Sequence, residues 1–100
     1  MSDCCLTLLC PPMQEERLLD LLLVSVGSEI FTSAPLSAHG VSTGHLSTSE
    51  QVMGRARATQ IQVLIATQAK EALLAEIREQ FPGIHFRYWV APVLEMGKIE

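Results

Sequence analysis

The organisation of the chain is decided by residues 38–58, whose sequence is AHGVSTGHLSTSEQVMGRARA. This stretch is polar, rich in Gly, Ser and Thr, and has no apolar periodicity, whereas the segments on both sides alternate as strands do. A loop of about twenty residues is uncommon inside a compact chain, and such loops are usually functional or disordered. We therefore expect the rest of the chain to be a scaffold that presents a functional loop over residues 38–58.

The composition limits the class of protein. The chain has 100 residues, 48% of them hydrophobic, and a formal net charge of −4. This length predicts a single domain over residues 1–100. A high apolar content in so small a chain favours oligomerisation, because exposed apolar patches usually mark contacts. The negative charge argues against nucleic-acid binding, which requires a basic face.

The N-terminal region carries no targeting pattern. Asp3 stands where a signal peptide has Lys or Arg, and the apolar run that follows is short. The longest apolar stretch, residues 18–26, is far too short to cross a membrane. Cys4, Cys5 and Cys10 are an odd number and lack the spacing of a disulfide framework. We expect a cytoplasmic protein without membrane insertion.

Three elements are expected before the loop. Residues 4–10 are a short apolar run ended by two prolines, which predicts a buried strand. Residues 12–24 predict a helix, because proline suits a first turn and the apolar positions recur with helical spacing. The apolar stripe of this helix comprises Leu18, Leu19, Leu22 and Leu23. Gly27 is expected to end the helix, and a second strand follows at residues 29–36.

Three elements are also expected after the loop. Residues 59–66 alternate with a period of two and predict a third strand. A second helix then extends to about residue 81, with Thr67 as its N-cap. Residues 84–91 predict the fourth strand, which Pro92 ends. In that strand Ile84, Phe86, Tyr88 and Val90 are expected to face inward, and His85, Arg87 and Trp89 to face the other side.

The predicted order is β-α-β-β-α-β, the split β-α-β pattern of ferredoxin-like folds. This α+β class places both helices on one face of an antiparallel sheet, since both crossovers are right-handed. The other face of the sheet has no covering element, although it carries Cys5, Leu9, Leu64 and Trp89. These side chains are poorly suited to water, so we expect this face to pack against a partner subunit.

A local motif stands at the entrance of the long loop, where residues 40–45 are GVSTGH. The order of the elements and the position of this motif resemble the PII-like superfamily. That group includes the PII nitrogen-signalling proteins, which carry G-x-x-x-G-H at this point, and the CutA-type divalent-cation-tolerance proteins. Residues 61–65, IQVLI, are similar to the strand that leaves the loop in that family.

The resemblance implies a homotrimer with ligand clefts between subunits. It also implies a small sensor or regulatory protein whose loop changes order when a ligand binds, and so acts on a partner such as a membrane transporter. Gly40 matches a glycine whose backbone approaches the phosphate of an adenine nucleotide. The other residues of the implied ligand site are Ser42, Gly44, His45 and Arg57. No paired carboxylates or nucleophile with a nearby base stand out, so we do not expect an enzyme.

The chain departs from the PII pattern at four places. Ser42 stands where PII proteins have a Gln that holds the Mg-nucleotide and 2-oxoglutarate. Ala58 stands where they have a Lys that contacts phosphate, although Arg57 is adjacent. Their second phosphate loop is reduced here to Pro82-Gly83. The chain has one tyrosine, Tyr88, outside the loop, which excludes uridylylation at the loop tyrosine of the family.

A second hypothesis is a heavy-metal-binding or metal-tolerance protein. His39 and His45 flank the glycine motif and offer imidazole ligands that suit Zn, Cu or Ni, and Met53 suits copper(I). The alternative interpretation is a pair of solvated or structural loop histidines. Cys4 and Cys5 point to opposite faces of a strand and are better explained by packing. A soft divalent metal is therefore the alternative ligand, and a ligand-free interaction module remains a third hypothesis.

Overall fold

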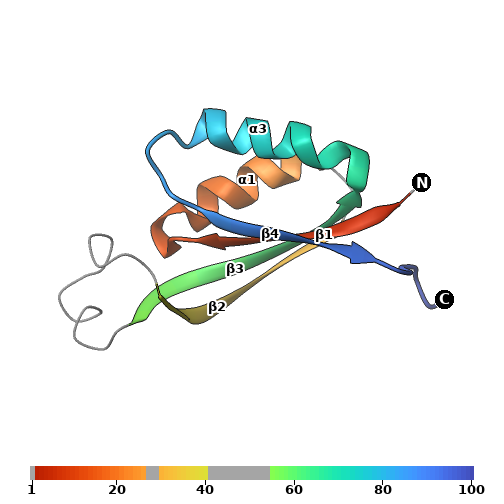
Figure 1. The fold of residues 1–100 in the computed structure, drawn as a ribbon, viewed down its shortest axis with the longest axis horizontal. Coiled ribbons are helices and arrows are strands. Elements are labelled where there is room, and N and C mark those ends of the chain that lie inside the picture. Colours follow the sequence, from red (N-terminus) through yellow and green to blue (C-terminus); the bar gives the residue numbers. More distant parts are fainter. Residues whose placement is uncertain (1, 27–29, 41–54) are drawn as a thin grey trace.

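The sheet and its two helices form the α+β arrangement that the sequence predicts. The computed structural model describes residues 2–26, 30–40 and 55–100. Its elements are β1 (Asp3–Cys10), the 3-10 helix η1 (Pro12–Gln14), α1 (Glu15–Ser25), β2 (Phe31–His39), β3 (Arg55–Ala66), the 3-10 helix η3 (Thr67–Ala69), α3 (Lys70–Gln80) and β4 (Arg87–Val93). The strands pair antiparallel in the order β2-β3-β1-β4. Both helices lie on one side of this sheet (Figure 1), which confirms the ferredoxin-like fold.

The core lies between β1, β3 and the two helices. Leu6 and Leu8 of β1 are fully buried, since successive side chains of a strand face opposite sides and these two face the helices. The whole cluster comprises Cys4, Leu6, Leu8, Cys10, Leu18, Leu22, Ile61, Val63, Ile65, Leu73, Leu74, Ile77 and Phe81. No helix in the described part of the chain is long and apolar enough to cross a membrane.

The apolar face of α1 is narrower than the leucine pattern predicted. Leu18 and Leu22 are fully buried, and Leu19 is partly buried, but Leu23 is 60% exposed. At about 100° per residue, Leu23 is rotated roughly 140° away from Leu18 around the helix axis. The prediction that Leu23 belongs to the core stripe is therefore wrong. The predicted helix itself is present as η1 followed by α1.

Thr67 holds the N-terminus instead of capping the second helix. Neither η3 nor α3 has a side-chain hydrogen bond at its cap. The Thr67 hydroxyl accepts a hydrogen bond from the Ser2 hydroxyl at 3.0 Å, and its backbone N–H donates to the Ser2 carbonyl at 3.0 Å. The capping prediction is therefore wrong, because the hydroxyl has a partner from the chain terminus.

β4 begins and ends later than predicted, and Pro92 lies inside it. β4 is an edge strand, where a residue without an N–H is tolerated on the unpaired side. Tyr88 and Val90 lie opposite Leu8 and Leu6, so they face the helix-bearing side as predicted. They nevertheless remain 45% and 38% exposed. Their burial was overestimated because β4 lies at the edge of the sheet.

The pairing of β2 with β3 extends further than predicted, into both ends of residues 38–58. Ala38 lies opposite Ala56, and His39 lies opposite Arg55. Residues 38–39 and 55–58 therefore belong to paired strands, and the predicted loop limits of 38 and 58 are wrong. Cross-strand pairing extends these strands through residues whose composition alone suggested a loop. Residues 41–54 and residues 27–29 lie outside the described residues.

One arginine joins the two helices. Arg17 Nη1 donates to Gln14 Oε1 at 3.1 Å, and Nη2 donates to the Gln80 carbonyl at 3.1 Å. The guanidinium carbon also lies 4.6 Å from the centroid of the Phe81 ring. The Gln80 carbonyl is at the end of α3, where carbonyls have no partner within the helix. Arg17 therefore satisfies a helix end and contacts an aromatic face at the same time.

We expect Arg17→Ala to lower the free energy of unfolding by about 1–2 kcal/mol, from one net hydrogen bond and one cation–π contact. Urea denaturation followed by circular dichroism measures this loss. Arg17→Lys keeps the charge but lacks the forked donors, so it should fall between the wild type and Arg17→Ala. A wild-type denaturation midpoint for Arg17→Ala would contradict this assignment.

Candidate functional site

The first candidate site lies at the end of the β2–β3 hairpin, at the same end of the molecule as the start of α1 (Figure 1). His39 ends β2, and Gly40 follows with a φ of +78°. Glycine adopts this left-handed conformation without the steric cost that a Cβ brings. A Cβ built on Gly40 would meet no heavy atom of the described residues within 4 Å. Within the described part of the chain, the backbone at Gly40 therefore leaves space for another group.

Arg57 lies on the neighbouring strand close to this turn. It pairs with Ser37, while His39 pairs with Arg55 two residues along. Diagonal neighbours on one face of an antiparallel pair are roughly 7–8 Å apart, within reach of long side chains. Arg57 and His39 are both exposed. The register thus makes the Arg57 guanidinium and the His39 imidazole diagonal neighbours on one face, and Gly40 directly follows His39.

The hairpin is fixed to the start of α1 just below this place. The Thr59 hydroxyl donates to Glu15 Oε1 at 2.7 Å, and Thr59 is buried on the same face of β3 as Arg57. This contact was not predicted, and the only sign of it was a polar residue in an otherwise apolar strand face. It gives the candidate site a fixed base, because it joins β3 to the first turn of the helix.

Cys10, opposite Thr59, is unsuited to binding a metal. Burial, together with the negative charge of Glu15, raises the pKa of the Cys10 thiol to about 11. The thiol therefore stays protonated, and its Sγ donates to the Pro11 carbonyl at 3.2 Å. Cys4 is also buried, whereas Cys5 is partly exposed on the opposite face of β1. This arrangement agrees with core packing of Cys4 and Cys10.

The structure locates some of the predicted site residues. His39 ends β2 directly before Gly40, and Arg57 pairs with Ser37, two residues before His39 on that strand. Four residues named from the sequence lie outside the described residues: Ser42, Gly44, His45 and Met53. Within the described ranges, no three His, Cys, Asp or Glu side chains are grouped so that they could hold a metal ion. The proposed pairing of His39 with His45 therefore stays a prediction.

Solved structures with similar folds cover nearly the whole chain. A DUF3240 family protein from Shewanella baltica OS155 is 14% identical with a TM-score of 0.82, covering 100% of this chain and 99% of its own. CPII from Thiomonas intermedia K12, a nitrogen regulatory PII-like protein bound to ADP, AMP and bicarbonate, is 18% identical with a TM-score of 0.73, covering 99% and 98%. The periplasmic divalent cation tolerance protein CutA from Archaeoglobus fulgidus is 12% identical with a TM-score of 0.69, covering 98% and 89%.

The fold is therefore that of PII-like and CutA proteins, as the element order and the loop motif predicted. It is a fold found in small regulatory proteins. No curated protein matches the chain in sequence. The profile of the family described as "Protein of unknown function (DUF3240)" matches residues 1–100, and the chain belongs to that family.

Proposed function

We propose that this protein is a non-catalytic sensor of a small anionic ligand, with an adenine nucleotide as the first candidate. The observation that carries this proposal is the conformation of Gly40, which has a φ of +78° and no heavy atom of the described residues within 4 Å of its Cβ position, with Arg57 on the paired strand opposite Ser37. The likeness to CPII, which was solved with ADP, AMP and bicarbonate, supports the same ligand class. The segment between β2 and β3 would carry the signal to a partner protein.

In this proposal, several residues at the hairpin end each contribute to phosphate binding. The backbone at Gly40 allows close approach, because no Cβ stands in the way. The forked donors of Arg57 suit phosphate or carboxylate oxygens. Ser42, Gly44 and His45 would complete the site. The connection between α3 and β4 spans residues 81–86, longer than the Pro82-Gly83 turn that the sequence suggested, but it has one glycine and no lysine. It therefore does not match the second phosphate loop of PII proteins, and we expect weaker nucleotide binding than in those proteins.

We further propose that the protein is a cytoplasmic homotrimer, and that its signalling partner is a membrane transporter or another protein. No described element covers the side of the sheet opposite the helices, which supports the oligomer, because Trp89 is 50% exposed there and Cys5, Leu9 and Leu64 are only partly buried. Three free cysteines agree with a reducing compartment. The net charge of −4 supports neither nucleic-acid binding nor attraction to an acidic surface.

Gly40→Ala is expected to weaken ADP or AMP binding at least tenfold, because the methyl group fills the space that the phosphate needs. The matched control is Gly83→Ala. Gly83 also has a φ of +78° and an open Cβ position, so both changes carry the same backbone strain of about 1–2 kcal/mol. Only Gly40 lies at the proposed site. Calorimetric titration gives the affinity of each variant for the nucleotide. Thermal unfolding gives the loss of stability that the backbone strain causes.

Equal losses of nucleotide binding in the two glycine variants would mean that binding fails through instability, and would remove Gly40 from the site. Unchanged binding in Gly40→Ala would place the nucleotide elsewhere. Binding lost in Gly40→Ala and kept in Gly83→Ala supports the assignment, provided the two variants melt at similar temperatures.

The second candidate function is metal binding or metal tolerance, which the position of His39 and the likeness to CutA favour. His39 is exposed at the end of β2, on the strand that leads into the segment containing His45. A thermal-shift panel separates the candidates, because a ligand that binds only the folded state raises its melting temperature. Stabilisation by Zn, Cu or Ni that His39→Ala removes, without any effect of nucleotide, would favour the metal.

A further inference from the structure

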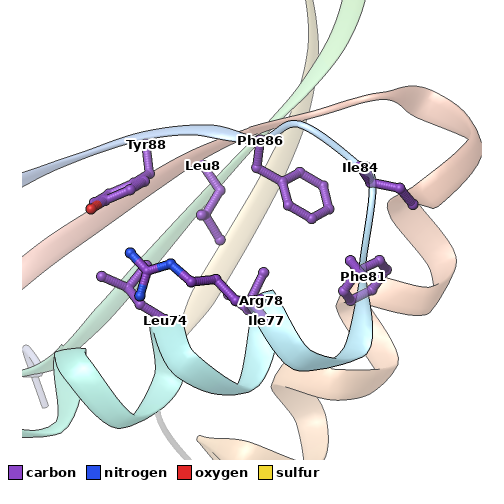
Figure 2. Close-up of a pocket in the computed structure, with 8 residues that line it drawn as sticks. All are labelled: Leu8, Leu74, Ile77, Arg78, Phe81, Ile84, Phe86 and Tyr88. Carbon is purple, nitrogen blue, oxygen red and sulfur yellow. The ribbon is translucent and has the colours of Figure 1, made fainter.

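A pocket of about 110 Å³ lies between α3 and β4, on the helix-bearing side of the sheet and apart from the hairpin end. Its walls come from β1, α3, β4 and the connection between α3 and β4. Leu8 stands on β1, Leu74 and Ile77 stand on α3, and Phe86 precedes β4. Figure 2 shows Leu8 and Phe86 pointing from the sheet toward α3. No described side chain fills the space between them.

The walls of the pocket are held in place by packing. Leu8 is fully buried, and Leu74 and Ile77 are 5% and 4% exposed. At the end nearest the α3–β4 turn, the rings of Phe81 and Phe86 meet edge to face, with centroids 5.3 Å apart and planes at 77°. Such pairs are specific in geometry as well as apolar. The cavity is therefore a preformed feature of the fold.

Two exposed side chains, Arg78 and Tyr88, supply polar groups at the rim. Figure 2 shows the Arg78 side chain extending toward the part of the pocket where Tyr88 lies. Within the described residues, the Arg78 guanidinium forms no hydrogen bond or salt bridge. The neighbouring carboxylate, Glu71, is already held by Lys70 at 2.7 Å. Lys70 is the main cause of the lowered pKa of Glu71, and Arg78 contributes least.

We infer that this pocket binds a small hydrophobic carboxylate, with its apolar group between Leu74 and Phe86 and its charge at Arg78. The pocket, at about 110 Å³, is smaller than the roughly 150 Å³ cavity of similar lining that takes up benzene, so it has room for one ring at most and the carboxylate would lie outside, at the rim. An apolar interior with one polar contact at the rim is typical of small-molecule sites. A cation at the rim favours an anion over a neutral or positively charged ligand of the same shape.

This site is independent of the proposed nucleotide site. It lies on the side of the sheet that carries the helices, so burial of the opposite face in an oligomer would leave it accessible. Nucleotide binding at the hairpin end and carboxylate binding at this pocket are therefore expected to fail separately when either set of residues is changed.

Benzoate is a suitable probe, titrated into the isotope-labelled full-length protein and followed by amide chemical shifts in NMR. We expect saturable shifts that concentrate in α3 and at residues 84–88, with a dissociation constant in the millimolar range for so small a ligand. Benzylamine, which has the same ring and the opposite charge, should bind at least tenfold more weakly. Equal binding of benzoate and benzylamine would contradict the role of Arg78.

Two variants and one control variant locate the ligand. Arg78→Gln should weaken benzoate binding at least tenfold, whereas Arg87→Gln, an exposed arginine whose side chain lies on the opposite face of the sheet, should leave it unchanged. Leu74→Phe fills the pocket and should abolish binding. If Leu74→Phe does not fold, the location of the chemical-shift changes in the wild-type protein decides whether benzoate binds in this pocket. The proposal is overturned by saturable shifts confined to other residues, by unchanged binding in Arg78→Gln, or by no saturable shift near the solubility limit of benzoate.

Discussion

Leu18→Ala is expected to lower the free energy of unfolding by about 2–5 kcal/mol, a large share of the stability of a small domain. Leu18 is 0% exposed and belongs to the cluster that joins α1 to the sheet. Removing three carbon atoms takes away apolar burial and leaves a cavity that the surrounding side chains fill only in part. Urea denaturation of the variant and the wild type measures the difference.

The matched control stands on the same helix. Leu23→Ala makes the same chemical change at a side chain that is 60% exposed, and it is expected to change the free energy of unfolding by less than about 0.5 kcal/mol. Both variants replace Leu by Ala inside α1, so the change in helix propensity is the same in both. The difference between their free energies of unfolding therefore reports the effect of burial. A comparable loss in Leu23→Ala would show that this side chain is buried in solution, for example in an oligomer.

The fold was predictable because the apolar patterns of β1, β3 and both helices agree with one another. The alternation in residues 59–66 and the short apolar run at residues 4–10 each identify a strand that the core then buries. The errors occur where tertiary structure overrides local pattern. Ala38 and Ala58 looked like loop residues, yet pairing between β2 and β3 holds them in strands at 8% and 9% exposure.

The candidate sites were less predictable, because they depend on contacts between distant segments. The motif at residues 40–45 indicated the hairpin end, and the register places Arg57 beside it. The pocket between α3 and β4 had no signature of its own. Arg78 sits in a helix where charged residues alternate with the apolar stripe, and the pattern indicated only a solvated side chain. Its position at the rim follows from where the edge strand crosses α3.

The bare face of the sheet is the feature of the described residues that most needs a partner. Cys5, Leu64 and Ala91 are cross-strand neighbours on this face. Thr7 beside them is buried, and its hydroxyl accepts from Gln62 Nε2 at 3.4 Å. Trp89 pairs with Thr7 and leaves half of its surface in water. An exposed apolar patch of this kind usually marks an interface between proteins, so we expect it to hold the proposed trimer together.

Leu64→Asp is expected to convert the protein from trimer to monomer. A carboxylate at this position would be buried without a partner at a subunit contact, which is strongly unfavourable. Within the single chain the cost is smaller, because Leu64 is only partly buried there. Analytical ultracentrifugation should therefore give the mass of one chain instead of three. The melting temperature should fall as well, since stabilisation by assembly is lost.

Met13→Asp is the control, because it places the same charge at an apolar residue that is 91% exposed near the start of α1, away from the bare sheet face. It should leave the trimer intact. Far-ultraviolet circular dichroism reports whether the Leu64→Asp monomer keeps its fold. A wild-type protein that sediments as a monomer, or a folded Leu64→Asp variant that sediments as a trimer, would remove the bare sheet face from the assembly. Equal dissociation of both aspartate variants would point to charge repulsion in place of a specific contact at Leu64.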